Sequence, residues 1–438
     1  MFKNLKFLLS LFLFLTSIFM VFPFSGGTGT LADPYTIITC QHLQDMNLDL
    51  GANYTLGSNI DCTGFDFNPI GNCTGDCESD GDDTPFLGNF EGNSYTISNL
   101  NITSLINTGN NGWGLFGNIR YGDITNIYIE DAYVFANDSQ VGSLIGFTRG
   151  ASITNISSTG LIQGNNTVGG LVGYAFNADI DNSHFEGVVA GNISVGGLIG
   201  YGESSYIYTS FSNASVTGNV FVGGFGGYFR IFSNIFNSYS DGTVIGTNFV
   251  GGFAGESYAS YIKNSYSKSS VSGTHLIGGL VGLNSRSATI ENSFSISNVT
   301  GINTSSTGAF VGVNDGDYSF PSGEPAFIDN SFFYNHSGNP DVAIGLDVDG
   351  GAVYAVDNLS YFYNESNAPF VYIFPFPSPT PENWSMFGWN FTGNNLPYLS
   401  WQENSNSQIG FTSQSTTSLF PIGGMVVSLL LILCFLLF

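Results

Sequence analysis

The chain has 438 residues, of which only 9% are charged, and its formal net charge is −25 at pH 7. Its 58 Gly, 40 Phe and 22 Tyr make a composition rich in turns and strands, and too apolar for a disordered chain. A surface that binds nucleic acid needs clustered Lys and Arg. The eight basic residues here are scattered, so we expect no nucleic-acid partner.

Residues 1–25 have the layout of a secretory signal peptide. Lys3 and Lys6 precede an apolar run that extends from Phe7 to about Phe24. The sequence before residue 26 has no small-residue cleavage motif, so an uncleaved anchor is the alternative. Both interpretations place the bulk of the chain outside the cell.

One helix is predicted near the N-terminus, over residues 39–49. Thr39 can serve as its N-cap, and Leu43, Met46 and Leu50 would share one face. We expect this helix to cover the open end of the β structure that follows, because an exposed strand edge needs a cover.

Residues 26–111, the N-terminal cap and first coils, contain four of the five cysteines: Cys40, Cys62, Cys73 and Cys77. In a secreted chain, an even and local set of this kind predicts two disulfides, with three possible pairings. A zinc site of four thiolates is the alternative, although Cys40 and Cys62 do not stand in closely spaced pairs.

Acidic residues at alternate positions form a candidate calcium loop: Asp76, Glu78, Asp80 and Asp82. A hard cation requires several oxygen ligands around a tight turn, which this spacing could supply. The twelfth position of the loop is Leu87 rather than Glu, so the full helix-loop-helix form is absent. The alternative is a solvated acidic hairpin tip. We expect no other cofactor.

A six-residue phrase of the type Val-Gly-Gly-Leu-Val-Gly recurs throughout residues 112–333. Its copies begin at Gly112, Val141, Val168, Val195, Val222, Val250, Ile277 and Thr307. The fourth positions of successive copies are 27 to 30 residues apart, a period typical of solenoids. Paired glycines permit bends and close backbone approach, so we expect each phrase to form a bend between strands.

A second phrase contributes Ile, then Asn two residues later, then an aromatic residue two further on. The Asn position is occupied by Asn126, Asn155, Asn182, Thr209, Asn237, Asn264, Asn292 and Asn330. Because alternate residues of an extended chain face the same side, we expect the Ile, Asn and aromatic side chains all to face the interior. The Asn would lie at a corner of the coil, hydrogen-bonded to the amides of neighbouring coils.

These columns predict an all-β fold, a right-handed parallel β-helix with three short strands in each coil of ~27 residues. Eight coils at the ~4.8 Å strand spacing would make a rod about 40 Å long. An up-and-down β-sandwich is the alternative, but it would not require columns locked in register.

The two phrases together resemble the GLUG-motif repeats of secreted, adhesin-like surface proteins. Residues 27–35 and 86–92 resemble the segment that often precedes these repeats, and residues 396–401 resemble a closing coil. The resemblance covers roughly residues 27–401. It implies a β-helical architecture and a role in surface attachment or adhesion, without defining an activity.

The C-terminal part is expected to be less regular over residues 334–401. Residues 402–419 form a polar stalk that is flexible by composition. Residues 420–438 are apolar, and two interpretations fit them: a short membrane span, or the signal for a lipid anchor that replaces the tail. We therefore expect an extracellular protein anchored at the cell surface.

Sequons for N-glycosylation are abundant and support this location. They begin at Asn53, Asn72, Asn101, Asn137, Asn155, Asn165, Asn192, Asn213, Asn298, Asn303, Asn335, Asn358, Asn364, Asn383 and Asn390. An Asn-, Ser- and Thr-rich chain also produces such triplets by chance. Their use requires a eukaryotic or archaeal host.

Six tyrosines of the middle repeats are the candidate ligand surface: Tyr201, Tyr206, Tyr208, Tyr228, Tyr258 and Tyr261. Tyr rings can stack on sugars while their hydroxyls form hydrogen bonds. We expect an adhesin-like protein that binds glycans, matrix or neighbouring cells, without catalysis. The alternatives are a structural envelope component and a polysaccharide lyase or hydrolase, although no His-Glu-x-x-His motif or Ser/His/Asp arrangement is legible.

Overall fold

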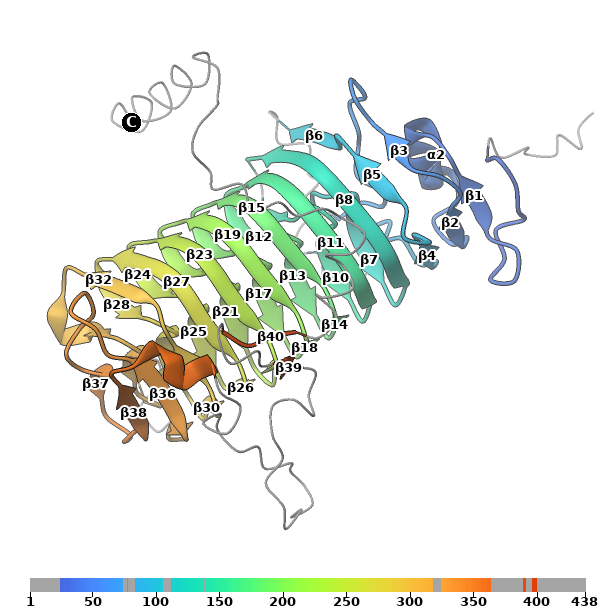
Figure 1. The fold of residues 1–438 in the computed structure, drawn as a ribbon. Coiled ribbons are helices and arrows are strands. Elements are labelled where there is room, and N and C mark those ends of the chain that lie inside the picture. Colours follow the sequence, from blue (N-terminus) through green and yellow to red (C-terminus); the bar gives the residue numbers. More distant parts are fainter. Residues whose placement is uncertain are drawn as a thin grey trace, which may run out of the picture.

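The computed structural model describes residues 24–73, 77, 83–104, 112–137, 139–317, 324–363, 389–390 and 396–399. Within these residues, parallel strands stack along one axis into a rod whose N-terminal end is blue and C-terminal end orange in Figure 1. The rod has about 8 turns. The predicted parallel β-helix is therefore confirmed.

One coil illustrates the architecture. It consists of β14 (Asp179–Asp181), β15 (His184–Ala190), β16 (Ile193–Gly196) and β17 (Ile199–Glu203). The next coil repeats it as β18 (Tyr206–Tyr208), β19 (Phe211–Thr217), β20 (Val220–Gly223) and β21 (Gly226–Arg230). The two coils pair in parallel, with Ile180 beside Ile207 and Val195 beside Val222.

The strands form three parallel sheets, which we number by their order within a coil. In addition to β14, β15, β18 and β19, sheet 1 contains β1 (Tyr35–Ile37), β2 (Tyr54–Leu56), β3 (Ile60–Asp61), β4 (Phe90–Glu91), β5 (Thr96–Ser98), β6 (Asn101–Ser104), β8 (Asp123–Ala136), β11 (Ser152–Gln163), β22 (Asn234–Phe236), β23 (Tyr239–Ile245), β26 (Tyr261–Lys263), β27 (Tyr266–Gly273), β30 (Thr289–Glu291), β31 (Phe294–Ser295), β32 (Asn298–Gly301), β35 (Phe327–Asp329), β36 (Ser331–Tyr334) and β38 (Val353–Val356).

Sheets 2 and 3 are formed by the strands on either side of the glycine phrase. In addition to β16 and β20, sheet 2 contains β9 (Ser139–Val141), β12 (Asn166–Gly169), β24 (Asn248–Gly251), β28 (His275–Gly278) and β33 (Thr307–Gly308). In addition to β17 and β21, sheet 3 contains β7 (Phe116–Arg120), β10 (Ile145–Arg149), β13 (Val172–Phe176), β25 (Ala254–Tyr258), β29 (Val281–Ser285), β34 (Val311–Asn314) and β37 (Ile344–Asp347).

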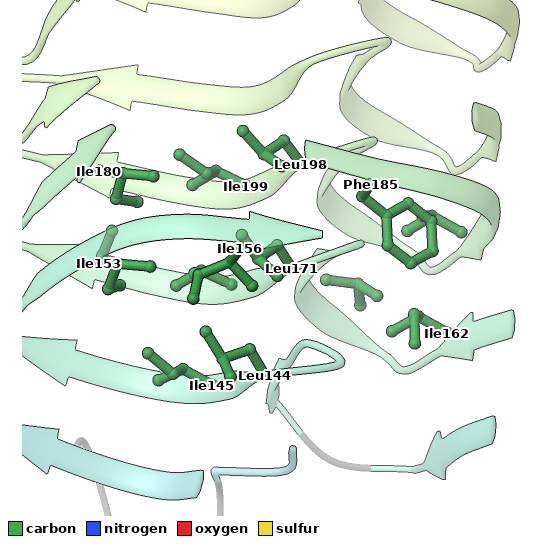
Figure 2. Close-up of a cluster of buried hydrophobic side chains, with 14 of the residues drawn as sticks. Leu144, Ile145, Ile153, Ile156, Ile162, Leu171, Ile180, Phe185, Leu198 and Ile199 are labelled. Atoms are coloured by element: carbon green, nitrogen blue, oxygen red, sulfur yellow. The ribbon is translucent and has the colours of Figure 1, made fainter. Parts of the chain in front are cut away.

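The glycine phrase forms the bend between sheets 2 and 3, as predicted. Its fourth residue points into the core, where Leu171, Leu198 and Phe225 are fully buried. Figure 2 shows Leu171 and Leu198 stacked between neighbouring coils. A Cβ at Gly197 would lie 2.0 Å from the carbonyl oxygen of Gly224, so only glycine fits this bend.

The Asn column occupies a corner of the coil, which confirms that part of the prediction. Asn155, Asn182 and Asn264 have left-handed backbones with φ of 58°, 48° and 50°. Asn adopts this region more readily than other residues with a Cβ. The amides also stack, since Nδ2 of Asn155 donates to Oδ1 of Asn126 at 2.8 Å and Nδ2 of Asn264 donates to Oδ1 of Asn237 at 3.2 Å.

The expectation that the aromatic column faces the interior is wrong. A left-handed residue at the corner breaks the alternation of the chain, so the ring two residues later faces outward. The outward rings stack in parallel on sheet 1, with centroids 4.4–5.0 Å apart: His184, Phe211, Tyr239, Tyr266 and Phe294. The following residue faces inward instead, as with the fully buried Phe185 and with Ser240, whose Oγ donates to the Gly252 carbonyl at 2.7 Å.

The N-terminal helix is shorter than predicted. α2 (Cys40–Asp45) ends where the 3-10 helix η1 (Met46–Leu48) begins, and Leu43 and Met46 are buried. Thr39 is its N-cap as predicted, with Oγ1 accepting from the backbone N–H of His42 at 3.1 Å. The helix lies at the N-terminal end of the rod (Figure 1).

Two disulfides form, which selects one of the three possible pairings. Cys40 in α2 pairs with Cys62, with Cα atoms 5.4 Å apart. Cys73 pairs with Cys77, with Cα atoms 5.0 Å apart. All four sulfurs are consumed in this way, so the alternative zinc site of four thiolates is not formed.

The coils continue beyond residue 333, because β37 pairs with β34 and β38 pairs with β36. A segment that we call the C-terminal strap then lies on the outer face of sheet 1; it consists of η3 (Leu359–Tyr363) and residues 396–399, which include β40 (Tyr398–Leu399). Phe362 stacks on Phe294 at 4.9 Å, and the Tyr266 hydroxyl donates to the Pro397 carbonyl at 3.0 Å. β40 pairs antiparallel with β39 (Trp389–Asn390).

The predicted stalk and C-terminal anchor, and nearly all of the predicted signal peptide, lie outside the described residues. Among the residues that are described, no helix combines the length and apolar character needed to span a bilayer. The η2 helix (Thr304–Ser306) is a single short turn before β33.

Candidate functional site

The structure divides the six predicted tyrosines into two groups. Tyr201, Tyr228 and Tyr258 lie on the outer face of sheet 3, in β17, β21 and β25. The other three, Tyr206, Tyr208 and Tyr261, lie in sheet 1, on β18 and β26 beyond the next corner of the coil. Ring contacts join the members of the first group to one another, so sheet 3 carries the larger assembly.

This assembly, which we call the aromatic tract, runs along the rod over several coils. It consists of Phe147, Tyr174, Tyr201, Tyr228 and Tyr258 on sheet 3, together with Phe221 and Phe249 on sheet 2. Successive centroids from Phe147 to Tyr228 are 5.2, 4.6 and 5.3 Å apart, with edge-to-face geometry. Phe221 stacks on Tyr228 at 4.8 Å and contacts Phe249 at 4.7 Å.

Only the middle of the tract is open to solvent. Phe147 and Tyr174 are buried in a cluster with the Cys73–Cys77 disulfide, and Tyr258 at the other end is 4% exposed. The half-buried rings between them are those of Tyr201, Tyr228, Phe221 and Phe249. Each of these four rings is therefore partly packed and partly open to solvent.

Polar groups border the open part of the tract. The Tyr201 hydroxyl donates to Glu203 Oε2 at 2.9 Å and accepts from Arg230 Nη1 at 3.3 Å. Arg230 Nη1 lies 3.8 Å from Glu203 Oε2, and the guanidinium lies 5.9 Å from the centre of the Tyr258 ring. Burial raises the pKa of Tyr201 to about 12, so its hydroxyl stays protonated at physiological pH.

Glu256 lies beside Tyr228 in the next coil, at the position where the preceding coils carry an aromatic ring. The residue is 3% exposed, and its carboxyl accepts from Ser285 Oγ at 2.7 Å. Burial raises the pKa of Glu256 to about 7, because the charged form loses its hydration. A group so deeply covered is out of reach of a ligand at the surface, so we assign Glu256 a structural part.

Two of the tract residues, Phe221 and Phe249, were missed at the sequence level. Both have φ of 55°, a left-handed conformation that costs a bulky residue about 1–2 kcal/mol. The corresponding positions in other coils are Gln140, Thr167, Ser194 and Leu276. A usable signal did exist for four other members of the tract. The residue after the last glycine of four successive phrases is Phe147, Tyr174, Tyr201 and Tyr228.

The tyrosines on sheet 1 form smaller contacts. Tyr206 is 44% exposed and Tyr261 is 36% exposed. The rings of Tyr206 and Tyr208 lie 6.2 Å apart, and Lys263 Nζ lies 5.7 Å from the Tyr261 ring while it pairs with Glu291 at 2.7 Å. The exposed rings of Tyr206 and Tyr261 are suitable controls for the tract.

The predicted calcium ligands Asp76, Glu78, Asp80 and Asp82 lie outside the described residues, so calcium binding stays a prediction. The neighbouring Asp83 is described and forms a buried ion pair with Arg120 at 2.7 Å. In the part of the chain that the structure describes, no three His, Cys, Asp or Glu side chains gather closely enough to hold a metal ion.

The sequons differ in the accessibility of their asparagines. The following asparagines are exposed: Asn137, Asn155, Asn165, Asn213, Asn298, Asn335 and Asn358. The amide nitrogens of Asn155 and Asn335 already donate hydrogen bonds, each at 2.8 Å. The partly buried sequon asparagines are Asn53, Asn72, Asn101, Asn192 and Asn303. Asn364, Asn383 and the side chain of Asn390 lie outside the described residues.

Comparisons with known proteins agree with the repeat assignment. Residues 164–190 match the GLUG motif. A stretch of 153 residues, 32% of this chain, is 33% identical to Halomucin from Haloquadratum walsbyi (strain DSM 16790 / HBSQ001). The matched stretch spans only 2% of the length of Halomucin.

The fold is also similar to a solved structure. A Bacteroides ovatus protein, provisionally described as an immunoglobulin A1 protease, superposes with a TM-score of 0.51 at 20% sequence identity. The match covers 86% of this chain and 95% of that protein. At this identity the likeness concerns the fold alone. The chain is thus a parallel β-helix, as its two phrases predicted, and residues 164–190 of it match the GLUG motif.

Proposed function

We propose that this chain is an extracellular, adhesin-like rod that binds glycans through the open part of the aromatic tract. The observation that carries the proposal is the continuous contact of half-buried rings from Tyr201 to Phe249. The C–H faces of sugars pack on such rings, and the border of Tyr201, Glu203 and Arg230 supplies donors and acceptors for hydroxyl groups.

The repeat of the rod is part of this proposal. The rings recur from coil to coil at the strand spacing of ~4.8 Å, so a polymeric glycan can contact several rings at once. Contacts made by one bound polymer are intramolecular after the first, which raises the overall affinity without requiring a deep pocket. A surface on which rings recur from coil to coil therefore suits a repetitive ligand.

Several features support the extracellular location. Two disulfides persist best in an oxidising compartment. The predicted signal peptide, the sequons and the likeness to Halomucin point the same way. Attachment through the C-terminal apolar segment, by a membrane span or a lipid anchor, belongs to the same proposal.

The decisive experiment is a binding assay of the secreted chain against a panel of glycans and against whole cells. We expect salt-tolerant binding to a neutral polysaccharide, because stacking is not screened by ions. A folded protein that binds no glycan and no cell would overturn the adhesin proposal and favour a structural envelope component. Release of shortened sugars from a bound polysaccharide would instead favour a hydrolase or lyase.

A further inference from the structure

A cleft of about 750 Å³ lies between the outer face of sheet 1 and the C-terminal strap. Its floor includes Lys268 from β27, Asn298 from β32 and Tyr334 from β36. Leu359 and Tyr363 of the strap form the opposite wall. Its volume lies in the range of about 300–1,000 Å³ that is typical of ligand sites.

The walls are held in place by contacts of the strap with the outward ring column of sheet 1. Phe362, next to Tyr363, stacks on Phe294 at 4.9 Å. Tyr361 lies 5.8 Å from Phe332, and Tyr266 donates to the strap backbone at 3.0 Å. The cleft is thus a constructed feature of the last coils.

One lining residue, Asn298, begins the sequon Asn298-Val299-Thr300. Asn298 and Thr300 are exposed on the outer face of β32, whereas Val299 points into the core and is 3% exposed. The acceptor amide and the hydroxyl that N-glycosylation requires are therefore both on the surface. A sugar attached here would begin inside the cleft.

We propose that an asparagine-linked glycan at Asn298 lays its first sugars in this cleft and ties the strap to the coils. In its attachment, the Asn298 amide nitrogen bonds to the anomeric carbon of a lipid-phosphate-linked sugar. The amide loses a proton, and the bond from that carbon to the phosphate oxygen breaks. The proposal rests on the extracellular route assumed for the proposed function, but not on the aromatic tract.

The chemistry of the lining suits a neutral sugar. The rings of Tyr334 and His336, 5.0 Å apart, and that of Tyr363 offer faces for C–H groups. His336 Nδ1 accepts from the Gly338 backbone N–H at 3.2 Å, which leaves Nε2–H as a donor. Lys268 pairs with Asp241 at 2.6 Å, so its charge is balanced while two of its three protons remain to donate.

The test compares Asn298 with Asn213, an exposed sequon asparagine on β19. The chain is secreted from a glycosylating host, and occupancy is measured by glycopeptide mass spectrometry. An amidase that removes N-glycans is then applied to the native protein. We expect release from Asn298 to be about tenfold slower than release from Asn213, because the strap must open first. After denaturation the two rates should be equal.

Two variants separate the glycan from the residues of the cleft. Thr300→Ala removes the sequon without altering a lining residue, and Thr300→Ser keeps it. Amide hydrogen exchange in η3 should be about tenfold faster in Thr300→Ala than in the original chain, and unchanged in Thr300→Ser. An unmodified Asn298, equal native release rates, or equal exchange in both variants would each overturn the proposal. The tract lies on sheets 2 and 3, whereas the cleft lies on sheet 1, so a failed glycan-binding assay would leave these outcomes unaffected.

Discussion

At the scale of single residues, backbone conformation selects side chains as strongly as chemistry does. Asn237 and Asn264 hold left-handed corners with φ of 51° and 50°, and their amides bond to each other at 3.2 Å. Asn satisfies both demands, since its short side chain tolerates this conformation and carries a donor and an acceptor. The two contributions can be separated by substitution.

Asn264→Ala should lose both contributions, whereas Asn264→Gly should lose only the amide. We expect unfolding free energies lower by about 2–3 kcal/mol for the Ala variant and about 1 kcal/mol for the Gly variant. Chemical denaturation followed by circular dichroism measures both. Ser270→Ala, at an exposed position on β27, is the control and should have no effect. Equal losses in the Ala and Gly variants would contradict a cost of the left-handed backbone.

Glu256 makes the stability of the rod depend on pH. Its pKa is about 7 in the folded protein, against an ordinary value of 4.5. Between these values the unfolded chain releases a proton that the folded chain retains, so stability falls as the pH rises from 4.5 to 7. Above pH 7 the full cost remains, on the order of 3 kcal/mol.

Glu256→Gln should therefore be more stable than the original chain at pH 8 and similar to it at pH 4. Thermal unfolding across this range measures the difference. His184, whose pKa burial lowers to about 4, contributes in the opposite direction, but equally in both proteins. Glu130→Gln, at an exposed position, is the matched control. If the Gln variant at position 256 were no more stable at pH 8, the pKa of the Glu256 carboxyl would not be raised in the folded protein.

At the scale of elements, the two faces of each coil carry different kinds of aromatic surface. On sheet 3 the rings meet edge to face and are bordered by an ionic group, while on sheet 1 they stack in parallel at 4.4–5.0 Å. The sheet 1 column is engaged by the strap through Phe294 and Tyr266. The rings of sheet 3 are thus the ones that remain accessible to a ligand.

The combined Tyr201→Ala and Tyr228→Ala variant should weaken glycan binding at least about tenfold, because stacking rings dominate such interfaces. Tyr201→Phe keeps the ring and should lose less. The matched control is Tyr206→Ala with Tyr261→Ala, which removes two exposed rings from sheet 1. Isothermal titration with the best glycan from the panel measures these affinities. An equal loss in the control variant would place the binding surface elsewhere.

The architecture could be predicted because the glycine phrase repeats in register. A bend that excludes a Cβ, as at Gly197, requires glycine at a fixed position of each repeat. A buried position such as that of Leu198 requires a large apolar residue, so both are recognisable in the sequence. The predicted orientation of the Phe211 side chain was wrong because the rule of alternation assumes an extended chain. The left-handed Thr209, with φ of 44°, interrupts the extended chain two residues before Phe211.

The candidate site could be predicted only in part. Tyr201 and Tyr228 were identified, but Tyr258 is almost fully buried by packing that involves other coils. Phe221 was missed because nothing in its neighbours indicates a left-handed backbone. Tyr206 lies beyond a corner of the coil, and a spacing along the chain does not reveal on which side of a corner a residue lies.

At the scale of the whole molecule, the rod is a one-dimensional stack in which each coil contacts its neighbours. Removal of one complete coil should therefore leave a folded, shorter rod. Deletion of residues 182–208 places Thr209 directly after Asp181. Ile180 then takes the place of the deleted Ile207 and pairs with Ile235, so the register is conserved. Small-angle scattering should show a rod about 5 Å shorter.

The matched control deletes residues 182–205, three residues fewer. It shifts every strand after the junction against the preceding coil, so buried and exposed side chains exchange places. We expect this variant to aggregate or unfold. Similar folding of both deletions would mean that register is not what holds the coils together.

The hydrogen bonds between coils, such as those that pair Val195 with Val222, point along the axis of the rod. Tension applied between the two ends therefore loads the coils in series, and each junction carries the whole force. We expect the rod to come apart one coil at a time in single-molecule pulling. Each step should release about 90 Å of chain, from 27 residues at 3.3–3.6 Å each. A tether of this design lengthens in steps under load, dissipating work before it breaks.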